Sequence, residues 1–296
     1  MSSLYLLLPS LARFDDAPRL KGWLARGDRL PDAPRGRETA LREAFQVPGT
    51  ALPVAALLRE HLAHDAGENI WLCADPAYVR VEANGARLLA CGGELQLTGE
   101  EAESLARPLR PLFGDAGAPL EITSPVNWAL RLPPGAQLPV FVPPHQALGT
   151  HLLEHLPQGN GGRRWRALFN EAQILLHSHP VNAARRERGL MPVNALWFWG
   201  AGASPMWVKS PLKLVISGDP LVQALASRAG VSSAAPAPDI LDSIESGTDA
   251  LLDSDRIEDG LFERILKRFA VAHLAFASGE RFRIKRRHRW RVWRKV

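Results

Sequence analysis

Two hydrophobic periodicities alternate along this chain, and their alternation constrains the fold more than any other sequence feature. Short apolar runs typical of buried strands occur at residues 4–8, 193–199 and 212–216. Between them lie stretches with helical spacing, most clearly residues 163–177, which Pro180 follows. Strands and helices that interleave in this way predict an α/β fold. With 296 residues, the chain is long enough for one large domain or two ordinary ones.

Local signals place several further elements. Residues 98–101 (Thr-Gly-Glu-Glu) have the spacing of a capping box, which predicts a helix start. Asp219 is predicted to cap a helix that reaches about Arg228, and Asn182 a short helix that Gly189 closes. Residues 231–240, which are rich in Ser, Ala and Pro, are predicted to be a linker.

The net charge of +5 is distributed unevenly. The last sixteen residues, 281–296, contain nine of the 36 Lys and Arg residues and no Asp or Glu. The other 280 residues therefore carry 27 basic side chains against 31 acidic ones. Only the end of the chain has a composition that favours an acidic partner such as a nucleic acid.

The N-terminal residues and the cysteines indicate a cytoplasmic protein. Residues 1–9 lack a basic region before a short apolar run, so they are interpreted as a buried first strand rather than a signal peptide. No apolar run reaches the roughly 18 residues that span a bilayer, so no transmembrane segment is predicted. The two cysteines, Cys73 and Cys91, do not make a disulfide framework in a chain of this length.

The segment 179–202 carries a recognisable pattern: it reads HPVNAARRERGLMPVNALWFWGAG. It resembles the part of archaeal-type cofactor-independent phosphoglycerate mutases that reads roughly HPxNxxRxxxGxxPANxIWLWGxG. The positions that match are His179, Pro180, Asn182, Arg185, Gly189, Pro192, Asn194, Ala195, Trp197, Trp199, Gly200 and Gly202. Weaker similarity extends the resemblance over roughly residues 70–230. Through Asn170-Glu-Ala-Gln173 and the Arg/Trp-rich end, the whole chain also resembles short bacterial proteins that are either phosphoglycerate-mutase-like or regulatory proteins of plant-associated bacteria.

The resemblance implies an alkaline-phosphatase-like core sheet with an inserted α+β subdomain, truncated relative to the parent family. The α/β core would comprise residues 1–75 and 189–296, and the insert residues 76–188. The chain would return to the core with the strand at 196–199.

The parent reaction moves a phosphoryl group through a serine and needs two metal ions held by Asp and His. In the family the first strand ends in Asp-Gly, whereas here Pro9 and Ser10 follow Leu8. After Gly202 the sequence has only His273 and His288, and neither neighbours an Asp. We therefore predict no catalytic residues, no metal site and no cofactor, and favour a non-catalytic protein with a binding or regulatory role. The alternative is a metal-dependent mutase or phosphatase with relocated ligands, drawn from Asp15, Asp16, His177, His179 and Asp219.

A guanidinium cluster precedes Gly189. It predicts an anion site in the cleft between insert and core, which would take an anionic small molecule or an acidic partner. The predicted residues are Arg185, Arg186, Arg188, His179 and Asn182. The open alternative is that these are ordinary helix surface residues.

Other candidate residues have ordinary interpretations. His145, His151 and His155, with His177 and His179, are interpreted as surface positions rather than zinc ligands. Ser178 lacks the turn of a nucleophile elbow. Trp197, Trp199 and Trp207 are predicted to pack in the core.

The basic end is predicted to form a strand over 282–293, paired as a hairpin with residues 274–277. Its cations are Arg281, Arg283, Lys285, Arg286, Arg287, Arg289, Arg291, Arg294 and Lys295. One interpretation is an edge strand whose charges discourage aggregation. The other is a basic ribbon for nucleic acid, anionic lipid or an acidic protein, which makes a nucleic-acid-binding protein the second alternative function.

Overall fold

The computed structural model describes residues 2–83, 85–237, 240–245, 247–257 and 260–291. The chain divides into two compact units, one made of residues 1–49 and 206–296 and the other of residues 50–205. The first unit is thus assembled from both ends of the chain, and the second from its continuous middle. Each unit has its own sheet and its own core.

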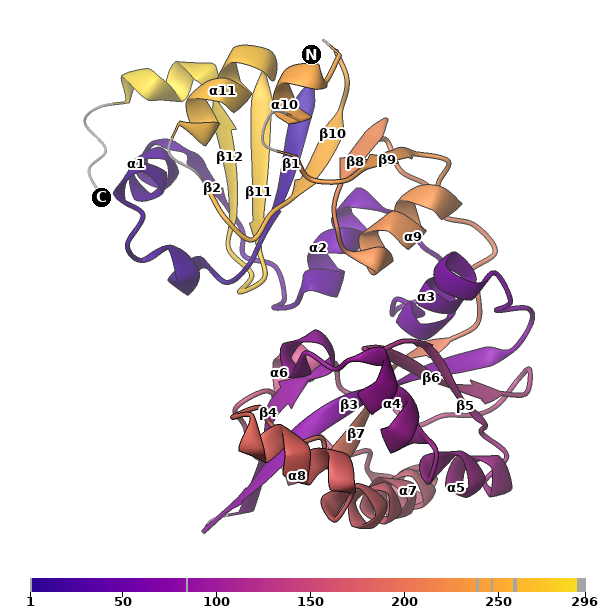
Figure 1. Ribbon diagram of the computed structural model, residues 1–296. Coiled ribbons are helices and arrows are strands. Elements are labelled where there is room, and N and C mark those ends of the chain that lie inside the picture. Colours follow the sequence, from indigo (N-terminus) through magenta and orange to yellow (C-terminus); the bar gives the residue numbers. More distant parts are fainter. Residues whose placement is uncertain (1, 84, 238–239, 246, 258–259, 292–296) are drawn as a thin grey trace. The chain divides into compact units, whose positions relative to one another are not determined.

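The first unit contains a seven-stranded sheet in the order β2-β12-β11-β1-β10-β8-β9. Its strands are β1 (Ser3–Leu8), β2 (Asp28–Leu30), β8 (Leu214–Ile216), β9 (Ser232–Ala234), β10 (Ala250–Asp253), β11 (Val271–Phe276) and β12 (Arg281–Lys285). Strands β1, β8, β9, β10 and β11 run parallel, while β12 and β2 are antiparallel to their neighbours. Indigo β1 lies between orange β10 and yellow β11 (Figure 1). A central parallel strand is covered on both faces, which explains its continuous apolar sequence.

Helices cover this sheet. They are η1 (Leu11–Phe14), α1 (Pro18–Arg26), α2 (Arg37–Ala44), α9 (Pro220–Arg228), α10 (Ile240–Ser243), α11 (Leu261–Arg268) and η4 (Arg286–Trp290). The predicted helix after Asp219 is confirmed as α9, and the Asp219 carboxylate accepts a hydrogen bond from the Leu221 amide at 2.7 Å. Part of the predicted linker 231–240 forms β9, because parallel pairing with β8 satisfies its backbone regardless of its small side chains.

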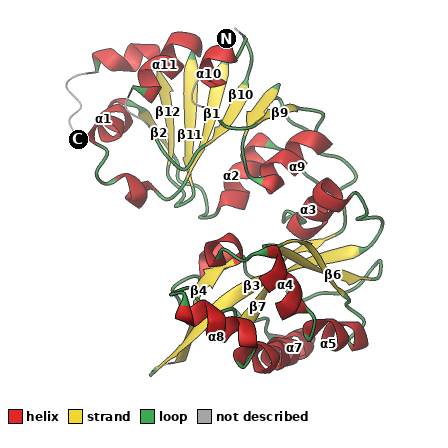
Figure 2. Cartoon of the chain, in the orientation of Figure 1, coloured by secondary structure: helices red, strands yellow, loops and turns green. Residues whose placement is uncertain are grey.

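The second unit contains a five-stranded antiparallel sheet (Figure 2). Its strands are β3 (Ile70–Glu82), β4 (Gly85–Cys91), β5 (Leu120–Ser124), β6 (Asn127–Leu132) and β7 (Ala195–Gly202). Its helices are α3 (Val54–Ala63), η2 (Gly92–Leu95), α4 (Gly99–Ala106), α5 (Leu109–Asp115), α6 (Pro144–Ala147), η3 (Leu152–Glu154), α7 (Gly159–His177) and α8 (Pro180–Glu187). The helix predicted at 163–177 is confirmed within α7, and its stripe from Trp165 to Leu176 is buried against the sheet.

Strand β3 is the longest strand and organises this sheet. On one edge it pairs with β6 through residues 70–73 and with β4 through residues 77–82; on the other it pairs with β7. Pro76 falls in the interval between the β6 and β4 ladders, where no neighbouring strand requires the N–H that proline lacks. Strand β3 therefore continues without a break through Pro76.

The unit boundaries differ from those expected from the sequence, 1–75 with 189–296 and 76–188. Residues 50–75 and 189–205 belong to the second unit, because β7 pairs with β3 rather than joining the parallel sheet. Helix α3 packs closely on β7: a Cβ at Gly200 would lie 2.8 Å from the Val54 Cβ, and one at Gly202 would lie 2.6 Å from the Pro53 Cβ. In the described part of the chain, no helix has both the length and the apolar character to cross a membrane.

Gly200→Ala should destabilise the second unit. Gly200 has φ +63°, which favours glycine, and the added Cβ would clash with Val54. We expect the free energy of unfolding to fall by about 2 kcal/mol or more in chemical denaturation. The control is Gly161→Ala in α7, where no atom lies within 4 Å of an added Cβ; it should be neutral or slightly stabilising. Equal effects at the two positions would contradict the close approach of α3 to β7.

Candidate functional site

The carboxyl edge of the parallel sheet is the first place to look for a site, because ligands of α/β sheets bind there. Strands β1, β8 and β10 run parallel, so the residues that follow them meet at this edge. Ser217 and Asp219 follow β8, and Asp253 ends β10. Arg37, the first residue of α2, reaches the same place.

Arg37, Asp219 and Asp253 form an ion-pair cluster to which Ser217 is hydrogen-bonded. Arg37 Nη2 lies 2.5 Å from Asp253 Oδ2 and 2.9 Å from Asp219 Oδ2. The Ser217 hydroxyl donates to Asp253 and accepts a hydrogen bond from the Asp219 amide at 3.0 Å. Burial works to lower the pKa of Arg37, but the two carboxylates outweigh it and hold that pKa above its usual value. The Arg37 guanidinium therefore keeps its charge and is shared by the carboxylates of Asp219 and Asp253.

The donor set does not fit a two-metal phosphoryl-transfer centre. Such a centre needs several carboxylate or imidazole ligands that are free to coordinate. Here Asp219 and Asp253 already share the Arg37 guanidinium, and the described residues contain no group of three or more His, Cys, Asp or Glu side chains that could hold a metal ion. Of the other proposed ligands, Asp15 and Asp16 are exposed near η1, and Asp15 pairs with Lys21. His177 and His179 lie in the second unit.

Arg185, the centre of the predicted anion site, is fully buried and hydrogen-bonded to the protein itself. Its Nε donates to the Met191 carbonyl at 2.9 Å, its Nη1 to Glu101 at 2.6 Å, and its Nη2 to the Leu95 carbonyl. Glu101 is the acidic member of the predicted capping box with Thr98, which is confirmed. Arg188 pairs with the second Glu101 oxygen. Burial works to raise the pKa of Glu101, but the Thr98 amide and the two arginines hold it below its usual value.

The side chain of Asn182 also bonds the backbone of the protein. It is buried inside α8 rather than capping the helix, and its amide nitrogen donates to the carbonyls of Leu176 and Val193. Its oxygen accepts a hydrogen bond from the Val193 amide at 2.7 Å. The actual cap of α8 is His179, whose Nδ1 accepts a hydrogen bond from the Val181 amide.

The one candidate of this set that remains available is Arg186, which is exposed and makes no ion pair in the described part of the chain. It lines a groove of about 860 Å³ within the second unit. His177 and Asn182 line the same groove, together with residues of β3 and α7.

Replacing Arg185 should damage the fold far more than replacing its neighbour Arg186. Arg185→Met leaves Glu101, only 12% exposed, and two backbone carbonyls without their main partner. We expect a loss of about 3–5 kcal/mol in the free energy of unfolding. The matched control, Arg186→Met, should leave stability nearly unchanged. Similar losses in urea denaturation for both variants would refute the buried role of Arg185.

A buried carboxyl group that the sequence did not single out lies in β3. Asp75 Oδ2 accepts a hydrogen bond from Trp199 Nε1 at 2.6 Å. Burial raises the pKa of Asp75 to about 7, although the Trp199 hydrogen bond opposes this shift. Burial, with Asp75 nearby, also raises the pKa of the Cys91 thiol well above its usual value. The only sequence signal was an acidic residue within the apolar stretch 70–79.

Asp75 should make stability fall as the pH rises. Its pKa is higher in the folded chain than the ordinary 3.8, so only the folded state retains the proton between about pH 4 and 7. The stabilisation is complete below pH 4 and decreases up to about pH 7. In Asp75→Asn we expect this decrease to shrink by a few kcal/mol, as measured by denaturation at pH 4 and 8. The control Asp16→Asn, at an exposed position, should follow the parent chain; an unchanged profile in Asp75→Asn would refute the raised pKa.

The basic end of the chain differs in part from the prediction. The hairpin is confirmed as β11 and β12, but β12 is an inner strand covered by β2, so the edge-strand interpretation is wrong. Residues 286–290 form the 3₁₀ helix η4 rather than more strand, and His288 is fully buried near Asp28. Pairing with the edge strand β2 and the apolar cover of α1 explain both differences.

Several of the basic side chains have partners within the first unit. Arg281 pairs with Glu43, and Arg283 and Arg291 pair with Asp28 at 3.3 and 2.7 Å. Arg289 stacks over Trp290, whereas Arg286 and Arg287 have no ion pair in the described part of the chain. Arg294 and Lys295 lie outside the described residues.

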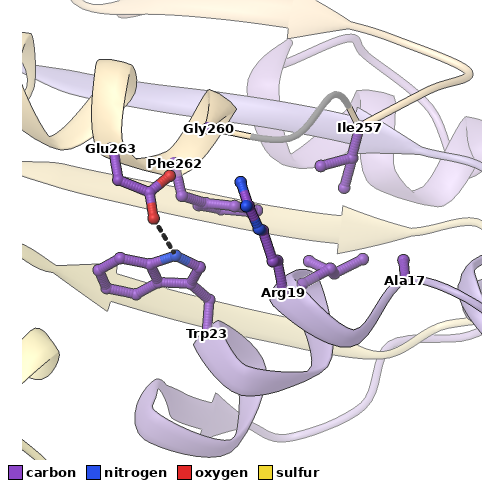
Figure 3. A pocket seen from close by; sticks show the side chains of 8 residues that line it. Ala17, Arg19, Trp23, Ile257, Gly260, Phe262 and Glu263 are labelled. Carbon is purple, nitrogen blue, oxygen red and sulfur yellow. Dashed lines mark hydrogen bonds between the residues drawn. The ribbon is translucent and has the colours of Figure 1, made fainter.

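The remaining candidates do not form a site. His155 contacts the Thr150 hydroxyl at 2.7 Å, and no histidine joins a cluster of metal-binding side chains among the described residues. Trp197 is buried as predicted, but Trp207 is 42% exposed beside Lys209. A small pocket between α1 and α11 contains the Trp23–Glu263 hydrogen bond of 3.3 Å (Figure 3). Its volume of about 20 Å³ is room for one water molecule.

Comparison with known proteins shows local homology to cofactor-independent phosphoglycerate mutases. The chain is 40% identical over 77 residues to a "Probable 2,3-bisphosphoglycerate-independent phosphoglycerate mutase" of Geobacter sulfurreducens, which is 26% of this chain and 19% of that protein. It is 39% identical over 66 residues to the 2,3-bisphosphoglycerate-independent phosphoglycerate mutase of Methanothrix thermoacetophila, or 22% of this chain and 17% of the mutase. The matches thus span about a fifth of the length of these relatives. No protein-family model matches the chain.

Two solved structures align with nearly the whole chain at low identity. A protein of Pyrococcus horikoshii aligns with a TM-score of 0.47 and 13% identity, covering 96% of this chain and 87% of that one. The cofactor-independent phosphoglycerate mutase of Thermoplasma acidophilum aligns with a TM-score of 0.38 and 15% identity, covering 96% and 88%.

Proposed function

We propose that this chain is a non-catalytic relative of the cofactor-independent phosphoglycerate mutases and serves a binding or regulatory role in the cytoplasm. In this proposal the first unit corresponds to an alkaline-phosphatase-like core. The second unit corresponds to the inserted α+β subdomain, enlarged by residues 50–75 and 189–205. The local homology to the mutases supports the relationship.

The observation that carries the proposal is the Arg37 ion pair at the carboxyl edge of the parallel sheet. The Arg37 guanidinium is bound to both Asp219 and Asp253, so it occupies the carboxylates that face this edge and offsets one of their two negative charges. A metal ion competing for Asp219 and Asp253 would have to displace a cation whose pKa is raised, so that it does not leave by losing its proton. The segment that most resembles the mutases, 179–202, contributes buried structural side chains instead of reacting groups.

The proposal predicts no metal-dependent turnover. We expect purified protein with added Mn²⁺, Mg²⁺ or Zn²⁺ to show no interconversion of phosphoglycerates and no hydrolysis of p-nitrophenyl phosphate above an EDTA-treated sample. Metal analysis should find no stoichiometric ion. EDTA-sensitive turnover that is lost in a folded Asp253→Asn variant would overturn the proposal and support the alternative, an enzyme with relocated ligands.

Nucleic-acid binding remains a second candidate, favoured by one observation. Arg286 and Arg287 have no ion pair in the described part of the chain, and Arg289 stacks on Trp290, which is 66% exposed. The test is the salt dependence of duplex DNA binding with these three arginines replaced by serine. Deleting 281–296 is unsuitable because it removes the inner strand β12. Affinity that is independent of salt and of these substitutions would reject this candidate.

A further inference from the structure

The groove beside β3 and α7 is lined by more polar and charged side chains than the fold requires. Asn182 and Asn194 line it but are bonded to the backbone. Asn170, Gln173 and Arg186 also line it, and none of the three has a fold-stabilising side-chain bond in the described part of the chain. The groove lies wholly within residues 50–205 and is open at the surface.

One wall of the groove is an edge of strand β3 that is only partly paired with a neighbouring strand. Strand β7 pairs with β3 as far as Ala77. The Asn194 side chain then takes the next position: its Oδ1 accepts from the Val79 amide at 2.8 Å, and its Nδ2 donates to the Val79 carbonyl at 2.7 Å. Alternate residues of a strand direct their amide and carbonyl to the same edge, so those of Val81 face the groove. In the described part of the chain, no strand covers this edge beyond Asn194.

Exposed apolar side chains border this edge. Val81 is 82% exposed and Ile174, on α7, is 72% exposed. Both line the groove, together with Pro192. Exposed β-branched residues beside an open strand edge are an arrangement that peptide-binding domains use for strand addition.

The basic side chains of the groove favour a ligand with negative charge. The described residues that line it include Arg80, Arg186 and His177 but no Asp or Glu. Arg80 is paired with Glu82 at 2.7 Å, which leaves Arg186 as the cation available to a ligand. An arginine beside an amide-rich wall suits a carboxylate-bearing chain.

We propose that this groove binds an extended acidic peptide segment, which adds as a short strand to the edge of β3 at Val81 and places a carboxylate against Arg186. The apolar side chains of the peptide contact Val81 and Ile174, and the amides of Asn170 and Gln173 bond its backbone. This inference rests on the proposed binding role and gives that role a class of partner.

The test uses the full chain and a fluorescent decapeptide of alternating Glu and Val, with binding followed by anisotropy. Its two controls are the alternating Lys and Val decapeptide and a Glu and Val decapeptide N-methylated at alternate residues. We expect the acidic peptide to bind, Arg186→Glu to weaken binding at least tenfold, and the Lys peptide and the N-methylated peptide to bind at least tenfold more weakly. Arg228→Glu, an arginine of the first unit, should not change the affinity.

Val81→Pro tests the strand edge from the protein side, because it removes the amide that the peptide would use. Val81→Ala retains that amide and should bind within a few-fold of the parent chain. Since Val81→Pro can also disturb the β3–β4 hairpin, the N-methylated peptide provides the same test without altering the protein.

Three outcomes would overturn the inference: no binding of the acidic peptide at about millimolar concentration, equal binding of the Lys peptide, or equal binding of the N-methylated peptide. A dimer that dissociates on Val81→Pro substitution would overturn it as well, by assigning the groove to a second copy of the chain. The phosphoglycerate mutase assay is separate. Failure of peptide binding without turnover would reject only the peptide, whereas EDTA-sensitive turnover would reject the proposed function.

Discussion

The buried Arg185 guanidinium is the interaction on which the second unit depends. It joins η2, α4 and the loop before β7, since its three nitrogens bond Leu95, Glu101 and Met191. Asn182 holds the same loop from the other side through Val193. Together they fix the residue at which β7 begins. Because β7 is antiparallel to β3, that residue also sets the point on β3, Ala77, beyond which β7 does not pair. The groove lies beside the part of β3 that β7 does not cover, next to Asn194.

This arrangement changes how the segment 179–202 is understood. Its resemblance to phosphoglycerate mutases first suggested an anion site, since arginines close together commonly bind phosphate. Two of these residues, Arg185 and Asn182, are required by the fold, because a buried guanidinium or amide is stable only when its hydrogen bonds are satisfied. A resemblance in sequence at these positions can therefore reflect shared packing rather than a shared ligand site.

Much of the local structure could be predicted from the sequence. The apolar run 4–8, the stripe of 163–177, the capping box at Thr98 and the Asp219 cap each depend on neighbouring residues, and all four are present. Predictions that depended on distant partners were less successful. Residues 286–290, predicted to be strand, form the helix η4, and the predicted edge strand β12 is covered by β2 from the other end of the chain. The Arg37 cluster joins positions 37, 219 and 253, whose proximity no local pattern reveals.

The discontinuous first unit also has a consequence for the order of folding. Strand β1 is synthesised first, yet its two neighbours are β10 and β11, and the amide of Ser3 bonds a carboxylate 246 positions later. The second unit is continuous, so every strand of its sheet has been synthesised before β8 is made. During synthesis the middle of the chain can therefore complete its sheet while the apolar strand β1 is still exposed, because its partners β10 and β11 are made later. That interval is when this protein would most need a chaperone.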